Sequence, residues 1–211
     1  MGYDKQINDD LRIRLTGSFY TTKSSVSNTL FGGDRTGSNY YFAMEPTTAT
    51  LTANAFSGRF NPGYRDNVTT FMVNPFVKYA GFEFFGTYES AKGNSAIENG
   101  EGTNLAKRDP RKTTQIAADL LYRFGSSEQF YVGARYNQVK STIAYGIGAA
   151  TQGTLTDVTI SRTAIGAGWF LTRNVLFKGE YVSQKYDGYP ANDRLAEGKF
   201  SGWVVQGIIG F

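Results

Sequence analysis

The stretch VTTFMVNPFVKYAGFEFFGTYES, residues 68–90, decides the fold class. Apolar residues occupy alternate positions in both halves of this stretch, which is typical of β-strands with one apolar and one polar face. Ala80 and Gly81 separate the two halves and predict a tight hairpin turn. One face of the hairpin is therefore apolar, with Phe71, Val73, Pro75, Val77, Tyr79, Phe82, Phe84, Gly86 and Tyr88. The other face is polar, with Asn74, Lys78, Glu83, Thr87 and Glu89.

Two further hairpins follow the same plan. Residues 113–124 and 130–140 alternate around a turn with the sequence GSSEQ, and residues 158–171 and 175–186 alternate around Thr172-Arg173-Asn174. Two more alternating segments, 11–22 and 199–211, stand at the two ends of the pattern. The sum is an all-β chain of eight antiparallel up-and-down strands, in which the first and last strands pair and close the sheet into a barrel.

The connections alternate in length, so that the short turns are separated by long polar links near residues 23–66, 91–112, 141–157 and 187–198. Short turns at one end and long loops at the other are typical of outer-membrane β-barrels. We expect one barrel domain over residues 1–211. Within the longest link, NYYFAME (39–45) and ATLTANAF (49–56) allow either an extra hairpin, giving ten strands, or a loop folded into the lumen.

Composition narrows the class of protein. The 211 residues include no Cys and no His, 15% are aromatic, and the formal charge is +4. No apolar run reaches the 18 or so residues that a membrane-spanning helix needs, whereas a barrel strand needs only about 9–11 alternating residues. Aromatic residues gather at the strand ends, as a girdle at a membrane interface requires. The alternative is a soluble, lipocalin-like binding barrel, whose apolar face points inward around a ligand.

The C-terminal segment WVVQGIIGF, residues 203–211, carries a family resemblance. A final amphipathic strand that ends in Phe resembles the signal by which Gram-negative outer-membrane proteins reach the barrel assembly machinery, and here it places that role on Trp203, Val205, Ile209 and Phe211. By strand count the chain resembles small OmpA/OmpX-type barrels. The phrases NDDLRIRLTGSFYTT, GDRTGSNYYFAME, VNPFVKYAGFEFFGTYE and FKGEYVSQKYDGYP resemble the C-terminal part of Bacteroidetes porin-type proteins, which are larger, so the chain could be part of a larger barrel. The resemblance implies an integral protein of the outer membrane, in contact with the lipid bilayer and lipopolysaccharide.

The polar faces hold the candidate functional residues. If these faces line the lumen of the barrel, the charged residues inside it are Arg12, Arg14, Lys78, Glu83, Glu89, Asp119, Arg123, Arg135, Arg162, Lys178 and Glu180. Two interpretations stay open: a structural network of ion pairs that fills a narrow lumen, or a water-filled path whose basic excess favours small anionic solutes. The function expected is accordingly that of a porin-like channel or of a passive barrel that displays loops. We expect no enzyme, no catalytic residues, no metal, no cofactor and no nucleic-acid partner, because barrel enzymes of the known kinds rely on histidine and no block of like charges occurs.

Overall fold

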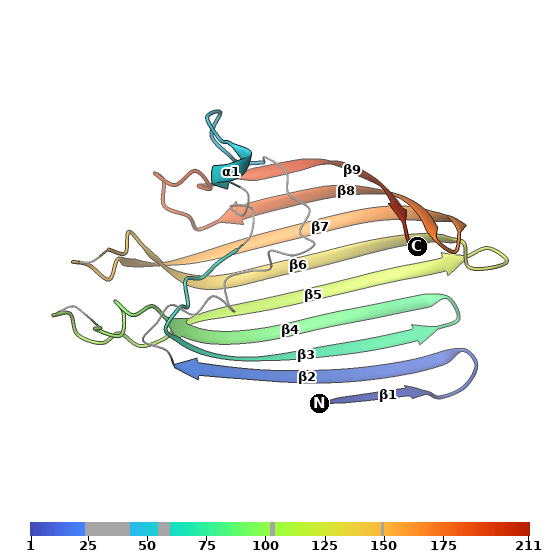
Figure 1. Ribbon diagram of the computed structural model, residues 1–211, viewed down its shortest axis with the longest axis horizontal. Helices are drawn as coiled ribbons and strands as arrows, with labels where there is room; N and C mark the ends of the chain where they lie inside the picture. The colour runs from blue at the N-terminus through green and yellow to red at the C-terminus, as the bar shows by residue number, and fades with distance from the viewer. Residues whose placement is uncertain (24–42, 55–59, 102–103, 149) are drawn as a thin grey trace.

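The computed structural model describes residues 1–23, 43–54, 60–101, 104–148 and 150–211. Nine strands form one antiparallel sheet in which every strand neighbours the next one in the chain (Figure 1). The strands are β1 (Gly2–Gln6), β2 (Leu11–Lys23), β3 (Asn67–Tyr79), β4 (Phe82–Asn94), β5 (Arg111–Phe124), β6 (Phe130–Tyr145), β7 (Thr154–Thr172), β8 (Val175–Asp187) and β9 (Lys199–Ile209). One short helix, α1 (Leu51–Asn54), is the only helix of the described ranges. The all-β, up-and-down architecture expected from the alternation is thus confirmed.

The three expected hairpins pair in the register that their turns impose. Tyr79 lies opposite Phe82 across the Ala80-Gly81 turn, whose residues have positive φ angles of 45° and 85°. Phe124 lies opposite Phe130, and Val175 pairs with Thr172 after a local irregularity at the third turn. Because the side-chain period of a strand is two, these registers bring the alternating apolar positions identified in the sequence onto one face of the sheet.

The first strand differs from the expectation. The segment expected to open the sheet is β2, and β1 lies along its outer edge, with Gly2 opposite Thr16 and Gln6 opposite Arg12. The eight expected strands correspond to β2–β9, and β1 is an addition. The expected pairing between the segments 11–22 and 199–211 is not formed in the described part of the chain. There β1 pairs with residues 12–16 on the edge of β2 that this pairing would use, and β9 pairs only with β8.

Turn lengths divide the two ends of the sheet as expected. Short turns join β1 to β2, β3 to β4, β5 to β6 and β7 to β8 at one end, on the right in Figure 1, and the long connections gather at the other end. We call these the turn end and the loop end. The strands reach further toward the loops than the alternation indicated, so that three of the long links shorten to residues 95–110, 146–153 and 188–198.

The longest link contains no strand in its described parts, which are residues 43–54 and 60–66. Here α1 occupies part of the segment 49–56 that the ten-strand alternative would make a strand, and the rest of that alternative falls largely outside the described residues. Residues 60–66, which we call the strap, return along the sheet: Tyr64 packs on Val68 and Ala91, with Tyr20 beside them, and these form the buried apolar cluster.

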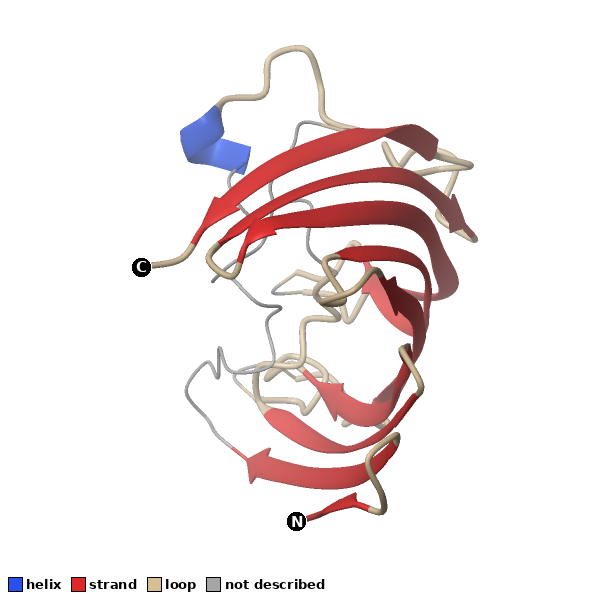
Figure 2. Ribbon diagram, turned by 90° about the vertical axis from the view of Figure 1, so that its right-hand side faces the viewer, coloured by secondary structure: helices blue, strands red, loops and turns tan. Residues whose placement is uncertain are grey.

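The sheet is strongly curved and forms an open C in section (Figure 2). The strap packs on the concave face. Its contacts Val68 and Ala91 are separated from Lys78 and Glu83 by even numbers of residues along β3 and β4, so all four lie on the polar side of the sheet. The large apolar side chains of the strands therefore lie on the convex face, where Phe71 and Leu120 keep 44% and 53% of their surface exposed. The sheet has almost no apolar core of its own, which is the reverse of a soluble β-domain.

Candidate functional site on the concave face

The strand register places all eleven candidate residues on the concave face of the sheet. Lys78 lies directly opposite Glu83, and Asp119 directly opposite Arg135. The remaining seven lie on β2, β4, β5, β7 and β8, and cross-strand pairing places them on the same face as these four. The sequence pattern thus brought together, on one surface, charged residues from seven strands.

The charges of this surface are largely arranged as ion pairs. Glu83 is shared by two cations, with its Oε1 atom 2.8 Å from Nε of Arg123 and 3.7 Å from Nζ of Lys78. Next along the sheet, Arg135 pairs with Asp119, and Arg162 lies 3.9 Å from Glu180. We call this row, from Lys78 to Glu180, the charge ladder. Its side chains are partly exposed, so each pair contributes little to stability and mainly balances charge.

The remaining candidates have other partners. Arg12 binds Asp4 of β1 with a nitrogen-to-oxygen distance of 2.7 Å, so the unexpected strand supplies the counter-charge for an expected residue. Arg14 lies over the ring of Phe76 at 5.1 Å, and Glu89 accepts a hydrogen bond of 3.1 Å from Thr70. Lys178 has no carboxylate within 4.0 Å among the residues that the structure describes.

A hollow of about 460 Å³ opens above the charge ladder. Its walls include Glu83, Asp119, Arg123, Arg135, Lys178 and Glu180 together with the rings of Tyr131 and Phe170. Glycines form part of its floor, and a Cβ at Gly166 would come within 2.9 Å of the carbonyl oxygen of Gly179. Beside the hollow, a Cβ at Gly168 would overlap the Tyr131 ring. The hollow offers water or a small solute both signs of charge.

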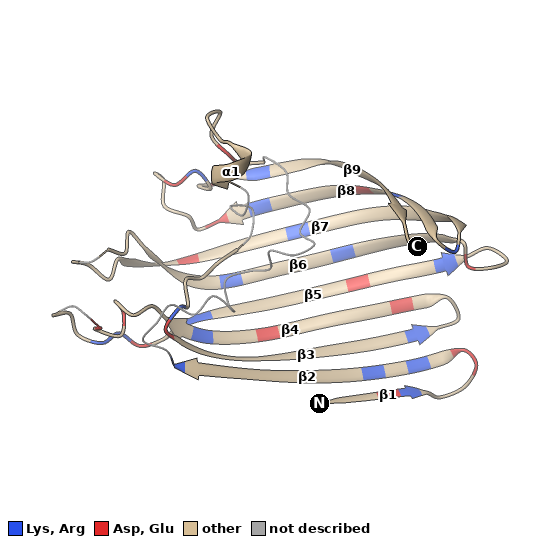
Figure 3. Ribbon diagram, viewed as in Figure 1, with Lys and Arg blue, Asp and Glu red and all other residues tan. Residues whose placement is uncertain are grey.

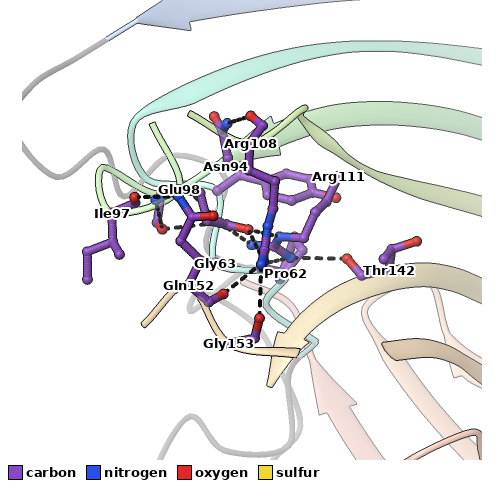
Figure 4. A network of polar contacts seen from close by, with 12 residues as sticks. Pro62, Gly63, Asn94, Ile97, Glu98, Arg108, Arg111, Thr142, Gln152 and Gly153 are labelled. Atoms are coloured by element: carbon purple, nitrogen blue, oxygen red, sulfur yellow. Dashed lines mark hydrogen bonds and ion pairs between the residues drawn. The ribbon is translucent and has the colours of Figure 1, made fainter. Parts of the chain in front are cut away.

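A second polar cluster closes the loop end of the concave face, and it centres on the buried pair Glu98 and Arg111 (Figure 4). The Nε and Nη2 atoms of Arg111 donate to the two carboxylate oxygens of Glu98 at 2.6 and 3.0 Å. Its Nη1 atom donates to the carbonyl oxygens of Pro62 in the strap and Thr142 in β6 at 2.9 and 3.1 Å. One guanidinium therefore joins the strap, the 95–110 loop and the loop end of β6.

The surroundings of this pair favour its charged form. Glu98 also accepts hydrogen bonds from the backbone and the hydroxyl of Ser95 at 2.9 and 3.1 Å. Burial acts to raise the pKa of Glu98, but the hydrogen bonds from Arg111 and Ser95 outweigh it and hold the pKa below its usual value. Burial raises the pKa of Tyr64, whose ring lies 5.0 Å from the Arg111 guanidinium and whose hydroxyl bonds Thr113 at 2.9 Å.

Further bonds extend the cluster to the neighbouring loop. Arg108 donates to the carbonyl oxygens of Gln152 and Gly153 at 2.8 and 3.0 Å, and Gln152 donates back to that of Ala106 at 2.6 Å. We call the whole arrangement around Glu98, Arg111 and Arg108 the loop clasp. Sequence reasoning missed it, because Glu98 and Arg108 fall in a link expected to be a solvated loop. No spacing signal could have found it, since the pairing depends on the path of that loop.

Chemically, the concave face offers charge, hydrogen bonds and some apolar surface, such as the rings of Phe76 and Phe85 in the wall of the hollow. The carboxylates of the ladder are engaged with cations, and the described Asp and Glu residues form no group of three or more that could hold a metal ion. Within the same ranges, no helix is long and apolar enough to cross a membrane.

Comparisons with models of known protein families and with curated proteins found no match. The resemblance to porin-type outer-membrane proteins therefore gains no support from relatives. The interpretation depends on the fold and on the distribution of side chains over its two faces.

Proposed function

We propose that this chain forms the wall of a membrane-spanning β-barrel of the outer-membrane type, with the concave face lining a passage for small solutes. One observation carries the proposal, namely the exposed apolar surface of the convex face. Large apolar side chains of β2–β9 cover it, from Leu15 and Phe19 to Trp203 and Val205, which are 76% and 78% exposed. Soluble monomers rarely expose a contiguous apolar surface that extends over so many strands, and a bilayer would cover it.

The arrangement of aromatic residues on the same face supports a bilayer. Near the turn end a row of rings crosses four strands, with centroid distances of 4.4 Å between Phe82 and Tyr122, 5.6 Å between Phe124 and Phe130, and 6.0 Å between Phe130 and Trp169. Six residues further along β4, Tyr88 lies 5.9 Å from Phe71. At a rise of about 3.3 Å per residue, Tyr88 lies about 20 Å along the strand from Phe82, so aromatic rings stand toward both ends of the apolar surface, as interfacial residues do.

The soluble, lipocalin-like alternative receives less support from these positions. A lipocalin buries its apolar face in the concave interior and presents a polar convex surface. Here the charge ladder lies on the concave side, and the apolar set lies on the convex side.

A barrel in a bilayer must satisfy the backbone groups of every edge strand. The edges are those of β1 and β9, and these strands run in the same direction because eight antiparallel pairings separate them. Pairing of β1 with β9 would give a parallel seam; pairing with additional strands would give a larger barrel. The proposed role of the two faces is the same in both cases.

Folding tests the membrane proposal directly. We expect the purified chain to show β-sheet circular dichroism and heat-modifiable gel migration in detergent micelles, and to remain unfolded or aggregated without detergent. A chain that folds fully in detergent-free buffer would contradict the proposal.

Conductance tests the passage. Reconstituted protein should give current steps in a planar bilayer, with a preference for anions because basic residues outnumber acidic ones on the concave face. Arg135→Glu combined with Arg162→Glu should weaken that preference, since both guanidiniums lie beside the passage. If no steps appear, the passage is refuted, and the barrel is a scaffold for its loops.

A further inference from the structure

A repeated order of side chains marks the convex face near the loop end. On six strands an apolar or aromatic residue is followed, two positions nearer the loops, by a hydroxyl or amide residue and, two positions further, by a lysine. The six sets are Phe19, Thr21 and Lys23; Tyr88, Ser90 and Lys92; Ile116, Thr114 and Lys112; Tyr136, Gln138 and Lys140; Tyr181, Ser183 and Lys185; and Trp203, Ser201 and Lys199. We call the six lysines the lysine belt, and all six are exposed.

The register concentrates the charge of the belt. Lys92 lies directly opposite Lys112, and Lys185 directly opposite Lys199. Figure 3 shows basic residues near the loop ends of β4, β5, β8 and β9. Like charges directly opposite each other destabilise a sheet unless something compensates them. On this face the described strands carry only two acidic residues. Asp187 lies 2.5 Å from Lys185, and Asp157 accepts a hydrogen bond of 2.6 Å from Thr142.

The belt is confined to one end of the sheet. Toward the turn end, the convex face of the described strands holds a single basic residue, Lys5 of β1. The lysines also lie at a fixed depth relative to the apolar surface, about 13 Å along each strand from the last large apolar residue. Long lysine side chains at that position can keep their stems on apolar surface and their ammonium groups among polar headgroups.

We propose that the lysine belt binds anionic phosphate headgroups of lipids in the membrane leaflet on the loop side. The inference builds on the proposed membrane-spanning function. Charge complementarity favours such headgroups, because the Lys92–Lys112 pair presents two ammonium groups to one phosphate, and the neighbouring hydroxyls can donate to its oxygens. In the second pair Asp187 balances Lys185, and Lys199 adds the charge that a phosphate would neutralise. Direct continuity with the apolar surface favours a lipid over a soluble acidic partner, since the same molecule would place its acyl chains on the apolar side chains.

The two tryptophans can report on the lipids that surround the two ends of the sheet. Trp203 lies four residues from Lys199, whereas Trp169 lies in the aromatic row at the turn end. Two single-tryptophan proteins, Trp169→Phe and Trp203→Phe, are reconstituted in phosphatidylcholine vesicles that contain either brominated phosphatidylcholine or the same fraction of brominated phosphatidylglycerol. We expect phosphatidylglycerol to quench Trp203 severalfold more strongly than its mole fraction predicts, and to quench Trp169 only in proportion.

Substitutions in the Trp169→Phe protein, which keeps Trp203 as its reporter, then test whether the lysines cause this enrichment of phosphatidylglycerol. Lys185→Gln with Lys199→Gln should abolish the enrichment, Lys185→Arg with Lys199→Arg should retain it, and the control Lys5→Gln should leave it unchanged. Equal quenching of Trp203 by the two brominated lipids, or enrichment that survives the Gln substitutions, would overturn the proposal that the lysine belt binds anionic headgroups. The proposed function fails separately, if brominated phosphatidylcholine quenches neither tryptophan.

Discussion

The loop clasp allows one prediction to be worked out from the structure. In Glu98→Gln the amide replaces a fully buried carboxylate whose two oxygens accept hydrogen bonds from Arg111 at 2.6 and 3.0 Å. The guanidinium of Arg111, itself only 5% exposed, would then be buried without a counter-charge. Removing one partner of a buried ion pair costs about 3–5 kcal/mol. We expect the lower value, because the carbonyl oxygens of Pro62 and Thr142 still accept from Arg111.

Hydrogen exchange of the 95–110 loop measures this cost. The amide of Arg108 donates to the carbonyl oxygen of Glu98 at 2.8 Å, so its exchange reports on opening of the clasp. A loss of about 3 kcal/mol corresponds to about 100-fold faster exchange of this segment. Glu101→Gln, which changes an exposed carboxylate in the same loop, should leave the exchange rate unchanged.

A double variant separates charge from packing. Glu98→Gln with Arg111→Met removes both charges and should restore part of the protection that either single variant loses, since no charge then remains buried and unpaired. If Glu98→Gln exchanges within about threefold of the parent protein, the clasp is not held by this ion pair, and the reasoning is refuted.

Two other predictions concern single positions. Because the pKa of Glu98 is lowered in the folded protein, its contribution to the stability of the loop clasp is complete above the ordinary glutamate pKa of about 4.3 and is lost as the pH falls through the lower folded value. Hydrogen exchange of the loop, corrected for intrinsic rates, should therefore accelerate on acidification in the parent protein but much less in Glu98→Gln. A parallel response in both proteins would contradict the assignment. In Gly168→Ala the new methyl group would overlap the Tyr131 ring, so urea unfolding in micelles should show a free energy of unfolding lower by about 1–3 kcal/mol. The control Gly202→Ala, whose methyl group meets nothing within 4 Å, should be near neutral, and equal effects of the two substitutions would refute the packing argument.

The strands and their faces could be predicted because they depend on local alternation. In residues 68–90 the period of two and the Ala80-Gly81 turn fix both the pairing of Lys78 with Glu83 and the side of the sheet on which each residue lies. The same logic reached Asp119 and Arg135 across a longer turn. Register alone sufficed for this part of the candidate site.

The rest depends on information that local pattern does not carry. The strand β1 has five residues with no apolar alternation, and it forms because β2 offers it an edge and Arg12 offers Asp4 a partner. The loop clasp joins Glu98 to Arg111 over 13 residues and reaches Gln152 in another loop. The path of a loop, unlike the register of a hairpin, is decided by such contacts and not by periodicity.

The most direct test of the central claim uses the absence of cysteine from the chain. Single cysteines are introduced at each position from 82 to 89 of β4, and the reconstituted proteins are exposed to a water-soluble maleimide. We expect labelling with a period of two. Positions 83, 85, 87 and 89 on the concave face should be labelled, and positions 82, 84, 86 and 88 on the convex face should be protected by lipid. Labelling of the convex positions with protection of the concave ones would contradict it.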